Sequence, residues 1–382
     1  MEKRIKTLFI PSWYPNKENK VSGIFIKNQA ISISKMCDVA VLYVKFDRED
    51  FETISKKDNI LEIIIYRKKS KYKLVSAFIF VYAYVKGLRK VKELFGIYDI
   101  AHIQVLHPSG VIYSFLNIFS SAPYIISEHS SIYLKEEGTF ERYNFIKKFL
   151  IKSAAKRAKA IIPVSEYLKN ALESCGIKNR MYIVPNIIKV DEESEFSNLS
   201  SAKNILHVSL LYDKTKNVSG ILDALKELSK RREDFRLDIV GNGVDKETLE
   251  KKAKDYDLLG KTVFFHGMIS PSEVGKFFSG SDFLVTNSKY ETFSVSTAEA
   301  LAYGKPVIST KCGGPEEYID ESNGILIDVG DTKALVSAIE YMLDNHDKYD
   351  AKLIRKEAKN KFSSEVVGER IFEVYKEILE KN

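Results

Sequence analysis

The sequence predicts an α/β protein of two domains, each built around a parallel β-sheet. Short apolar runs alternate with helical stretches along almost the whole chain, which is the pattern of parallel α/β architecture. The chain has 382 residues and is 45% hydrophobic, so it can bury two cores of ordinary size. An acidic, serine-rich stretch at residues 191–203 separates two series of strands and is predicted to be a linker.

The predicted strands divide into a first domain, residues 1–190, and a second domain, residues 204–365. Each strand is a short apolar run that ends at a polar or glycine-containing loop. A GxGxxG fingerprint is absent, which counts against an NAD-dependent enzyme. In chain order the predicted strands are 5–10, 39–44, 61–66, 99–104, 124–127, 160–164, 204–209, 235–240, 262–265, 282–286, 306–309 and 324–327.

The two halves of the chain carry opposite charge. Residues 1–190 contain 32 Lys or Arg against 17 Asp or Glu, a balance of +15, whereas residues 191–382 have a balance of −8. The positive excess indicates an anionic partner for the first half, either a membrane surface or nucleic acid. Nucleic acid is disfavoured, because the basic segments come with no nucleic-acid-binding fold and no interleaved aromatic residues for stacking bases.

An apolar run at residues 74–85 is too short, at 12 residues, to span a bilayer. Basic clusters flank it at residues 67–73 and 86–92, and a second basic helix is predicted at 147–157. Such a combination is typical of interfacial anchors on anionic lipid, so we expect peripheral contact with an anionic membrane. The alternative is a packed core helix whose charged ends are solvated.

The cysteines and the N-terminus indicate a cytoplasmic setting. Cys37, Cys175 and Cys312 are widely spaced and show neither zinc-binding nor redox spacing, so a reducing compartment is expected. Residues 1–6 lead directly into a predicted strand whose apolar run is too short for a secretory signal. Together with the basic half, this places the protein in the cytoplasm, at the inner face of the cytoplasmic membrane.

The stretch 282–309 carries the clearest chemical signal. Glu291 is predicted on the loop that leaves the strand 282–286, and Glu299 about two turns into the following helix. The N–H groups at the start of that helix form a ready phosphate site, at the sheet edge where open α/β proteins bind ligands. This layout suggests a nucleotide-sugar site, with one Glu for a sugar and one for a ribose diol. The alternative is a capped amphipathic helix with exposed glutamates.

Glu291 and Glu299 resemble the Glu-x7-Glu signature of retaining glycosyltransferases of family 4. That resemblance implies the GT-B fold, in which two Rossmann-like domains with parallel sheets face a central cleft. It also implies that Phe293, Ser294 and Val295 lie beside the donor diphosphate. The last helix, residues 366–382, is expected to pack back on the first domain, as it does in this family.

Lysines follow the first strand of the second domain. Lys214 and Lys216 lie on a loop that reaches the same sheet edge as Glu291, where a cation can stabilise a departing diphosphate. The segment resembles the Arg-x4-Lys phosphate element of the family, with Lys216 in the lysine place. It departs from that element because Leu210 stands where Arg is usual and the loop is one residue longer. Lys214 is expected to supply the missing charge, or else one lysine holds the diphosphate alone.

Further residues match donor-contacting positions of the family. Gly23 follows the first strand, where a glycine lets a ligand approach the backbone closely; its alternative is a plain loop glycine. His129 ends a strand of the first domain and matches the histidine that contacts the donor sugar, although a lone His is more often structural. Gly241 lies in the glycine turn beside the nucleotide, and Met268 lies where the base packs.

The resemblance implies a hexosyltransferase that moves a sugar from a nucleotide-sugar donor, a UDP- or GDP-sugar, to an acceptor hydroxyl. A glycan or lipid-linked acceptor in cell-surface polysaccharide or lipopolysaccharide assembly is expected. No cofactor and no metal are expected, because Asp255 and Asp257, which spell an Asp-x-Asp metal motif, end a charged, solvated helix. The alternatives are a nucleotide-sugar epimerase on the same fold and a non-catalytic subunit that binds sugar nucleotides, which Leu210 favours.

Overall fold

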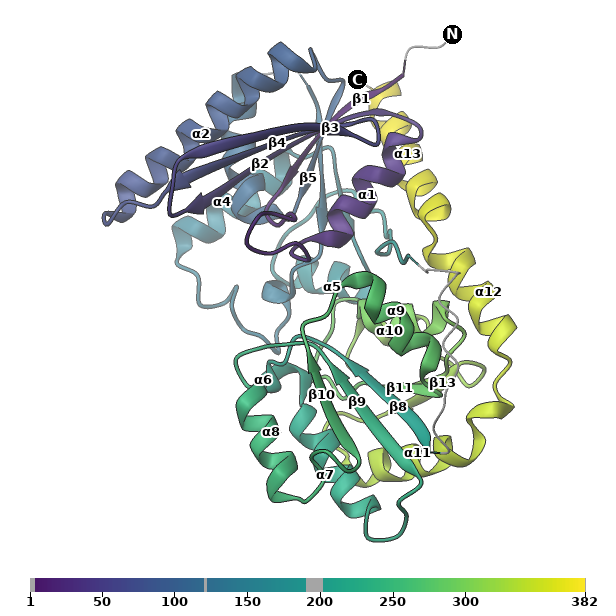
Figure 1. The fold of residues 1–382 in the computed structure, drawn as a ribbon. Coiled ribbons are helices and arrows are strands. Elements are labelled where there is room, and N and C mark those ends of the chain that lie inside the picture. The colour runs from purple at the N-terminus through teal and green to yellow at the C-terminus, as the bar shows by residue number, and fades with distance from the viewer. Residues whose placement is uncertain (1–3, 120–121, 190–201, 382) are drawn as a thin grey trace. The chain divides into compact units, whose positions relative to one another are not determined.

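The computed structural model describes three stretches of the chain, residues 4–119, 122–189 and 202–381. The chain divides into two units, shown in Figure 1: unit 1 contains Met1–Ile187 and Ser364–Asn382, and unit 2 contains Ile188–Ser363. Each unit has its own sheet and hydrophobic core. The predicted linker lies outside the described residues from 191 to 201, and Lys203 begins the first strand of unit 2.

Seven strands form the sheet of unit 1, in the order β3-β4-β2-β1-β5-β6-β7. All neighbouring strands are parallel except β3 and β4, which are antiparallel. The strand β3 is absent from the sequence-based prediction, because it is a largely polar and exposed edge strand. The bounds are β1 (Lys6–Pro11), β2 (Asp38–Asp47), β3 (Phe51–Lys57), β4 (Ile60–Lys68), β5 (Ile100–Gln104), β6 (Tyr124–Glu128) and β7 (Ala160–Pro163).

Helices cover both faces of this sheet. The helices α1 and α13 pack together on one face, against a core that includes Val39 and Val41 of β2. The intervening Leu42 points to the other face, where α2 packs so closely that a Cβ on Gly87 would lie 2.4 Å from the Leu42 side chain. The bounds are α1 (Ile24–Ser34), α2 (Lys73–Leu94), α3 (Val111–Leu116), α4 (Phe145–Arg157), α5 (Glu166–Ser174) and α13 (Ser364–Glu380).

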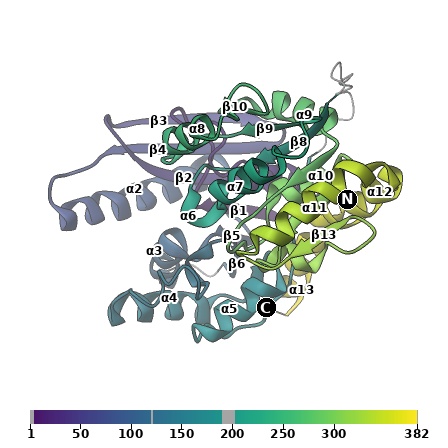
Figure 2. The same ribbon diagram turned by 90° about the horizontal axis from the view of Figure 1, so that it is seen from below.

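The helices α3 and α4 lie on the same face as α2 (Figure 2). Ile125 of β6 belongs to the core that α1 and α13 cover, so the neighbouring Tyr124 points to the opposite face. There its ring lies 5.6 Å from the ring of Tyr113 in α3. Its hydroxyl donates a hydrogen bond of 2.7 Å to the carbonyl oxygen of Ala154 in α4.

Six strands, all parallel, form the sheet of unit 2 in the order β10-β9-β8-β11-β12-β13. Its core lies between these strands and helices such as α7 and α11. The bounds of the strands are β8 (Lys203–Val208), β9 (Phe235–Val240), β10 (Val263–Gly267), β11 (Phe283–Val285), β12 (Val307–Thr310) and β13 (Gly324–Ile327). The bounds of the helices are α6 (Asp213–Lys216), α7 (Val218–Leu228), α8 (Lys246–Asp255), α9 (Pro271–Gly280), α10 (Val295–Ala302), α11 (Thr332–Asn345) and α12 (Ala351–Phe362).

The strand orders place a topological switch point in each sheet. In unit 2 the chain moves from β8 towards β10 on one side, and β11 to β13 lie on the other, so the switch point lies between β8 and β11. In unit 1 it lies between β1 and β5. Ligands of open α/β sheets bind outside the carboxyl ends of the strands at such points, because the connecting loops there diverge. The residues that follow these four strands are therefore the first candidates for a site.

Candidate functional site

The switch point of unit 2 brings Lys216 and Glu291 together. Lys216 ends α6, the short helix after β8, and Glu291 lies on the loop after β11. The Lys216 Nζ atom lies 2.5 Å from Glu291 Oε1, and the Ser288 hydroxyl donates to the same oxygen at 2.7 Å. The lysine and the glutamate are both half-buried, with side chains 23% and 13% exposed, so water screens this ion pair less than one on an open surface.

Backbone hydrogen bonds hold these two loops in register. The N–H of Lys289 donates to the carbonyl oxygen of Thr215 at 2.8 Å, which ties the loop after β11 to α6. The N–H of Glu291 donates to Cys312 O at 2.8 Å, and Gly314 N–H donates to Glu291 O at 2.9 Å. The Glu291 backbone is thus fixed on both sides by the loop after β12, so its carboxylate is positioned before any ligand arrives.

Glu299 differs from Glu291 in having no partner. The helix α10 begins at Val295, so Glu299 lies just over one turn into it and not two turns as the sequence suggested, because the preceding loop is longer. Among the described residues no hydrogen bond or ion pair of its carboxylate is found, and burial raises the pKa of Glu299 to about 7. A half-buried carboxylate without a partner is suited to accept hydrogen bonds from ligand hydroxyls.

The residues before α10 shape its N-terminus. Ser294 adopts a left-handed conformation, with φ 64°, and is largely buried. The side chain of Phe293 is also buried, against Phe362 and Tyr318, so only its backbone is available to a ligand. The Tyr318 hydroxyl lies 2.5 Å from Phe293 O and 3.0 Å from Ser294 O, which holds the turn in place. The N–H groups of the first turn of α10, from Val295 onwards, have no partner within the helix.

Glycines let three loops of unit 2 pass one another at the same edge. Gly241 follows β9 with φ 137°, and a Cβ there would lie 1.8 Å from the Ser209 carbonyl oxygen. Its N–H donates to Gly267 O at 2.9 Å, which joins the loop after β9 to the end of β10. Met268 follows directly and exposes half of its side chain, so it is accessible at this edge, as the predicted base-packing position requires.

The structure separates the two lysines of the predicted phosphate element. Lys214 precedes Lys216 by two residues in α6, which turns their side chains about 200° apart around the helix axis. Lys214 is exposed, and among the described residues it makes no hydrogen bond or ion pair. The side chain of Leu210, in the place of the usual Arg, is exposed as well. The structure thus brings Lys216, and not Lys214, to Glu291.

In unit 1 the predicted residues lie around the ends of β1 and β6. Gly23 precedes α1 with φ 62°, and a Cβ there would lie 2.5 Å from the Trp13 carbonyl oxygen. His129 is buried; its Nε2 lies 3.0 Å from Gln104 Oε1, and burial lowers its pKa to about 3. The imidazole is therefore neutral, and its Nε2–H donates inward to Gln104, so the ring cannot offer this proton to a ligand without breaking that bond.

Glu128 was singled out by no sequence feature, yet it organises this edge of unit 1. Its fully buried carboxylate accepts hydrogen bonds from the N–H groups of Leu106 at 2.9 Å, His129 at 2.9 Å and Ser130 at 2.8 Å. It thereby joins the loop after β5 to the loop after β6. Burial raises the pKa of Glu128 to about 7, against the opposing effect of these N–H donors. The signal available in the sequence was its position at the end of a strand that begins with the apolar residues Tyr124, Ile125 and Ile126.

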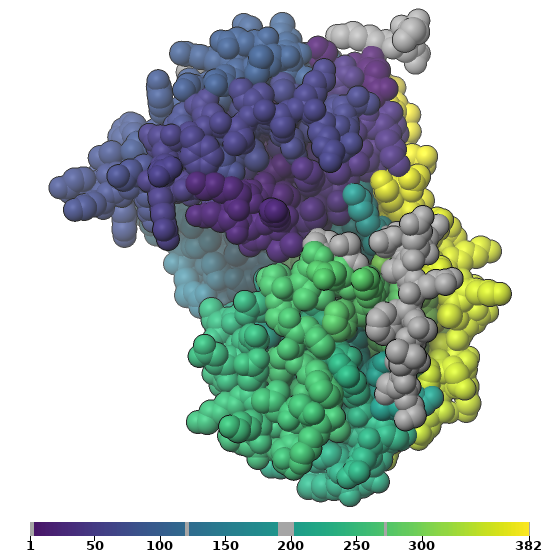
Figure 3. Space-filling view, viewed as in Figure 1, coloured from purple at the N-terminus to yellow at the C-terminus, as the bar shows by residue number. Residues whose placement is uncertain are grey.

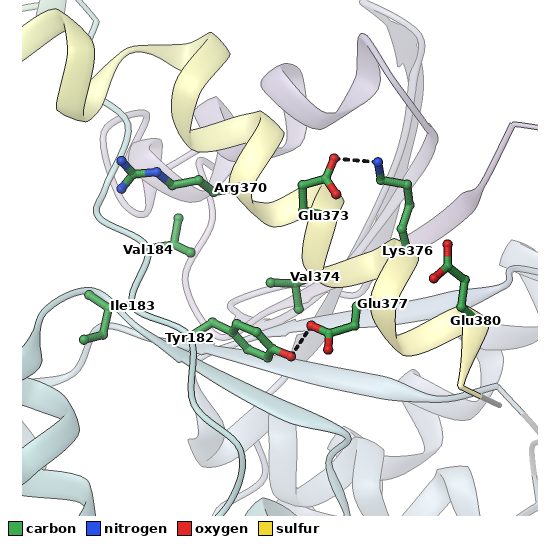
Figure 4. A pocket seen from close by; sticks show the side chains of 9 residues that line it. All are labelled: Tyr182, Ile183, Val184, Arg370, Glu373, Val374, Lys376, Glu377 and Glu380. Carbon is green, nitrogen blue, oxygen red and sulfur yellow. Dashed lines mark hydrogen bonds and ion pairs between the residues drawn. The ribbon is translucent and has the colours of Figure 1, made fainter.

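A pocket of about 540 Å³ also lies in unit 1, between α13 and the segment that follows β7 (Figure 4). Two pairs of its side chains interact: the Tyr182 hydroxyl donates to Glu377, and Lys376 lies 2.5 Å from Glu373. None of the residues predicted for a site lines it. It is therefore a groove between packed elements, apart from the residues predicted for the site.

Comparison with solved structures identifies the fold. HepE of Anabaena in complex with UDP-glucose superimposes with a TM-score of 0.74 over 98% of this chain and 100% of that chain, at 17% sequence identity. At this identity the likeness concerns the fold alone. Together with the two parallel sheets and the residues gathered at the switch point of unit 2, it defines a protein of the GT-B class, as the sequence predicted.

Comparison with known sequences identifies the family. The profile described as Glycosyl transferases group 1 matches residues 189–360, and the profile described as Glycosyltransferase Family 4 matches residues 24–192. An uncharacterized glycosyltransferase of Methanocaldococcus jannaschii is 27% identical over 98% of this chain and 99% of its own. The alpha-monoglucosyldiacylglycerol synthase of Streptococcus pneumoniae is 23% identical over 78% of this chain and 71% of its own. The chain belongs to glycosyltransferase family 4, and it is an enzyme of that class.

The described residues bear on two kinds of partner, a membrane and a metal ion. No helix there is both long and apolar enough to cross a membrane. No group of three or more His, Cys, Asp or Glu side chains that could hold a metal ion is found in the same part of the chain.

Proposed function

We propose that the protein is a retaining glycosyltransferase that moves a hexose-type sugar from a nucleoside-diphosphate sugar to an acceptor hydroxyl. The observation that carries this proposal is the convergence of Lys216 and Glu291 beside the N-terminus of α10, with Glu299 left without a partner in the same helix. One cation, one helix end and two carboxylates match the charges and hydroxyls of such a donor.

Each group has a proposed role. The diphosphate takes up negative charge as the glycosidic bond breaks, and Lys216 and the first N–H groups of α10 stabilise that charge. Glu299 accepts hydrogen bonds from the ribose diol. Glu291 accepts hydrogen bonds from the sugar hydroxyls, and in the free protein its ion pair with Lys216 keeps both side chains in place.

Retention of configuration is proposed from the resemblance to retaining glycosyltransferases of family 4. Among the described residues no obvious nucleophile lies beside Glu291, which disfavours a double displacement as the route to retention. Cys312 lies close by, but burial raises its pKa to about 12, so its thiol stays protonated. We therefore propose attack from the leaving-group side: the acceptor oxygen bonds to the anomeric carbon on the face from which the diphosphate departs. The bond from that carbon to the diphosphate oxygen breaks, and this oxygen takes the acceptor proton. Transfer is proposed to proceed without a metal ion.

The donor base and the acceptor are proposed by analogy with relatives. HepE is described in complex with UDP-glucose, which supports a UDP-sugar, and a GDP-sugar is the second candidate. The name of the Streptococcus pneumoniae relative describes synthesis of a glucosyl diacylglycerol, which supports a lipid-linked acceptor. We propose a glycan or lipid-linked acceptor in cell-surface polysaccharide or lipopolysaccharide assembly, at the inner face of the cytoplasmic membrane.

The test is release of nucleoside diphosphate from a panel of UDP- and GDP-sugars by the full chain, first with water and then with glycolipid as acceptor. We expect turnover with one donor, without added metal and in the presence of a chelator. The anomeric proton coupling of the product, measured by NMR, reports the configuration. An inverted product would contradict the retaining mechanism, and an absolute need for a divalent ion would contradict metal-free transfer.

One observation favours a second candidate, a non-catalytic subunit that binds sugar nucleotides. Leu210 exposes an apolar side chain where the family usually places an arginine, so the diphosphate has one cation fewer. Binding of a sugar nucleotide, seen as a rise in melting temperature, without any release of nucleoside diphosphate would support that candidate. Turnover of the bound donor would exclude it.

A further inference from the structure

Three elements of unit 1 expose large apolar side chains on one face of its sheet. They are α2, the end of α3 with the turn that follows it, and α4, which share a face of the sheet (Figure 2). We call their exposed side chains the apolar face. Its members are Leu74, Val75, Phe78, Tyr82, Phe115, Ile118, Phe145, Ile146, Phe149 and Leu150.

The helices of this face have one buried side and one exposed side. In α2 the residues that pack on the sheet include Ala83, Tyr84 and Gly87, and a different set is exposed. Phe78 is 77% exposed and Phe145 is 80% exposed, which is far more than a residue at the margin of a core shows. The apolar run that the sequence analysis noted is therefore not a core helix throughout: it supplies both the packing side and the exposed side of α2.

The exposed residues form stripes along the helices. Leu74, Phe78 and Tyr82 follow one another at intervals of four residues, which places them on the same side of α2. Phe145 and Phe149 repeat this interval in α4. Side chains of the segment around the start of α2 project from the surface at the left of Figure 3. A stripe of this kind needs an apolar partner, because each member otherwise remains in water.

Positive charge surrounds the stripes. The helix α4 contains Lys147, Lys148, Lys152, Lys156 and Arg157 and no acidic residue. The helix α2 begins with Lys73, just after Lys69 and Lys71, and its acidic residue is Glu93, near the other end. Among the described residues, Lys71, Lys73 and Lys156 make no hydrogen bond or ion pair within the protein, so they are available to an anionic partner.

The combination of exposed apolar side chains and unpaired lysines favours an anionic lipid bilayer as the partner over nucleic acid or a second copy of this chain. A bilayer of anionic lipid takes aromatic side chains into its interface, while the lysine ammonium groups remain at the headgroups. Nucleic acid would meet the charges but would leave Leu74, Ile146 and Leu150 in water. A second copy of this chain would bury the apolar stripes but would bring two positively charged faces together.

We propose that the apolar face and its lysines form a docking surface for an anionic membrane. Phe78, Phe145 and Phe149 enter the interface, and the available lysines Lys71, Lys73 and Lys156 contact the headgroups. Both helices begin at the carboxyl edge of the sheet, because a helix between parallel strands runs opposite to them. Docking therefore brings the edge of unit 1 that holds Gly23 and His129 close to lipid.

The meaning of this surface for catalysis rests on the proposed function, since a lipid-linked acceptor would reach the protein at that edge. Docking itself does not depend on transfer. Release of nucleoside diphosphate to water, without vesicles, therefore tests the proposed function separately, and vesicle binding tests the surface.

The experiment is co-sedimentation of the full chain with vesicles of about 30% phosphatidylglycerol in phosphatidylcholine, compared with pure phosphatidylcholine, at low and high salt. We expect binding to the anionic vesicles that weakens at least tenfold at high salt. The double variant Phe78→Ser/Phe149→Ser should lose at least tenfold in partition. The matched control, Tyr341→Ser/Leu353→Ser, removes apolar residues of unit 2 that are 49% and 42% exposed and should bind as the unaltered protein does.

Charge is tested with a second pair of variants. The variant Lys73→Glu/Lys156→Glu should lose binding to anionic vesicles. The control variant Lys251→Glu/Lys254→Glu, on the exposed side of α8 in unit 2, should retain that binding. All four variants should keep the circular dichroism spectrum of the unaltered protein, and they should release nucleoside diphosphate to water at the same rate as that protein. Equal binding to neutral and anionic vesicles, or no binding to either, would overturn the proposal. Two other results would overturn it as well. The unaltered protein would form a dimer in light scattering, or would bind RNA, and the Phe78→Ser/Phe149→Ser variant alone would lose that dimer or that binding.

Discussion

At the carboxyl edges of their sheets, the two units treat ionisable side chains differently. Unit 2 keeps Lys216 and Glu291 half-buried and paired, and leaves Glu299 without a partner. Unit 1 instead buries Glu128, which accepts from backbone N–H groups, and His129, whose Nε2–H donates to Gln104. The same architecture thus presents charge for a ligand in one unit and uses polar groups to hold loops in the other. Substitutions at the two edges should therefore have different kinds of effect.

The largest expected effect is on turnover and comes from unit 2. Lys216→Ala removes the cation beside the developing diphosphate charge and should lower kcat by about 1000-fold, or about 4 kcal/mol. Lys214→Ala, which removes an exposed lysine from the same short helix, should change kcat less than threefold, on the order of RT. Steady-state release of nucleoside diphosphate gives both values. Equal losses in the two variants would show that the side-chain directions in α6 do not decide the chemistry.

A second effect, on stability, is expected from Glu128 in unit 1. Between pH 4.5, its ordinary pKa, and about 7, the unfolded chain ionises this carboxyl while the folded unit keeps it neutral. The folded state then binds more protons, so this group lowers the free energy of unfolding as pH rises. Relative to Glu128→Gln, the unaltered protein should lose on the order of 3 kcal/mol over that range. Urea unfolding at both ends of the range measures the change; a difference that stays constant with pH would contradict it.

Gly23, in the loop after β1, allows the cost of a steric clash to be separated from the cost of backbone strain in the free energy of unfolding. Gly23→Ala should destabilise unit 1 by about 3 kcal/mol, because the new Cβ meets the Trp13 carbonyl and φ is positive. Gly330→Ala in unit 2 also has positive φ but meets no atom within 4 Å, so about 1 kcal/mol of backbone strain is expected. Thermal unfolding of the two variants gives the comparison. Similar losses would mean that the loop yields to the added methyl group.

The smallest expected effect concerns donor affinity. The free Glu299 carboxyl is half-protonated at about pH 7, and hydroxyl donors favour its ionised form. The affinity for a UDP-sugar should therefore fall about tenfold from pH 8 to pH 6, whereas Glu299→Gln should bind weakly at both. Calorimetric titration at the two pH values measures this. If the variant showed the same pH dependence as the unaltered protein, another group would be responsible.

Much of the fold was predictable because α/β strands are short, apolar and separated by polar loops. The twelve predicted strands all have counterparts, but β3 was missed, since an exposed edge strand lacks an apolar face. Proximity of Lys216 and Glu291 was predictable, because strand ends of a parallel sheet meet at one edge. The direction of Lys214 was not, since it depends on where the short helix α6 begins. Nor was the role of Glu128, because the chain pattern does not show which carboxylate three backbone N–H groups will surround.

The helix α13 links the order of synthesis to the order of folding. Unit 1 takes this helix from residues 364–380, and buries Val367, Ile371 and Tyr375 against its first strands. Those strands leave the ribosome before their partner helix, which is synthesised only after the whole of unit 2, whereas unit 2 is one continuous segment and can fold while translation continues. A chain cut short before Ser364 would expose the core of unit 1, which would favour its degradation. Folding of unit 1 is thus completed only after the segment that forms unit 2 has been synthesised.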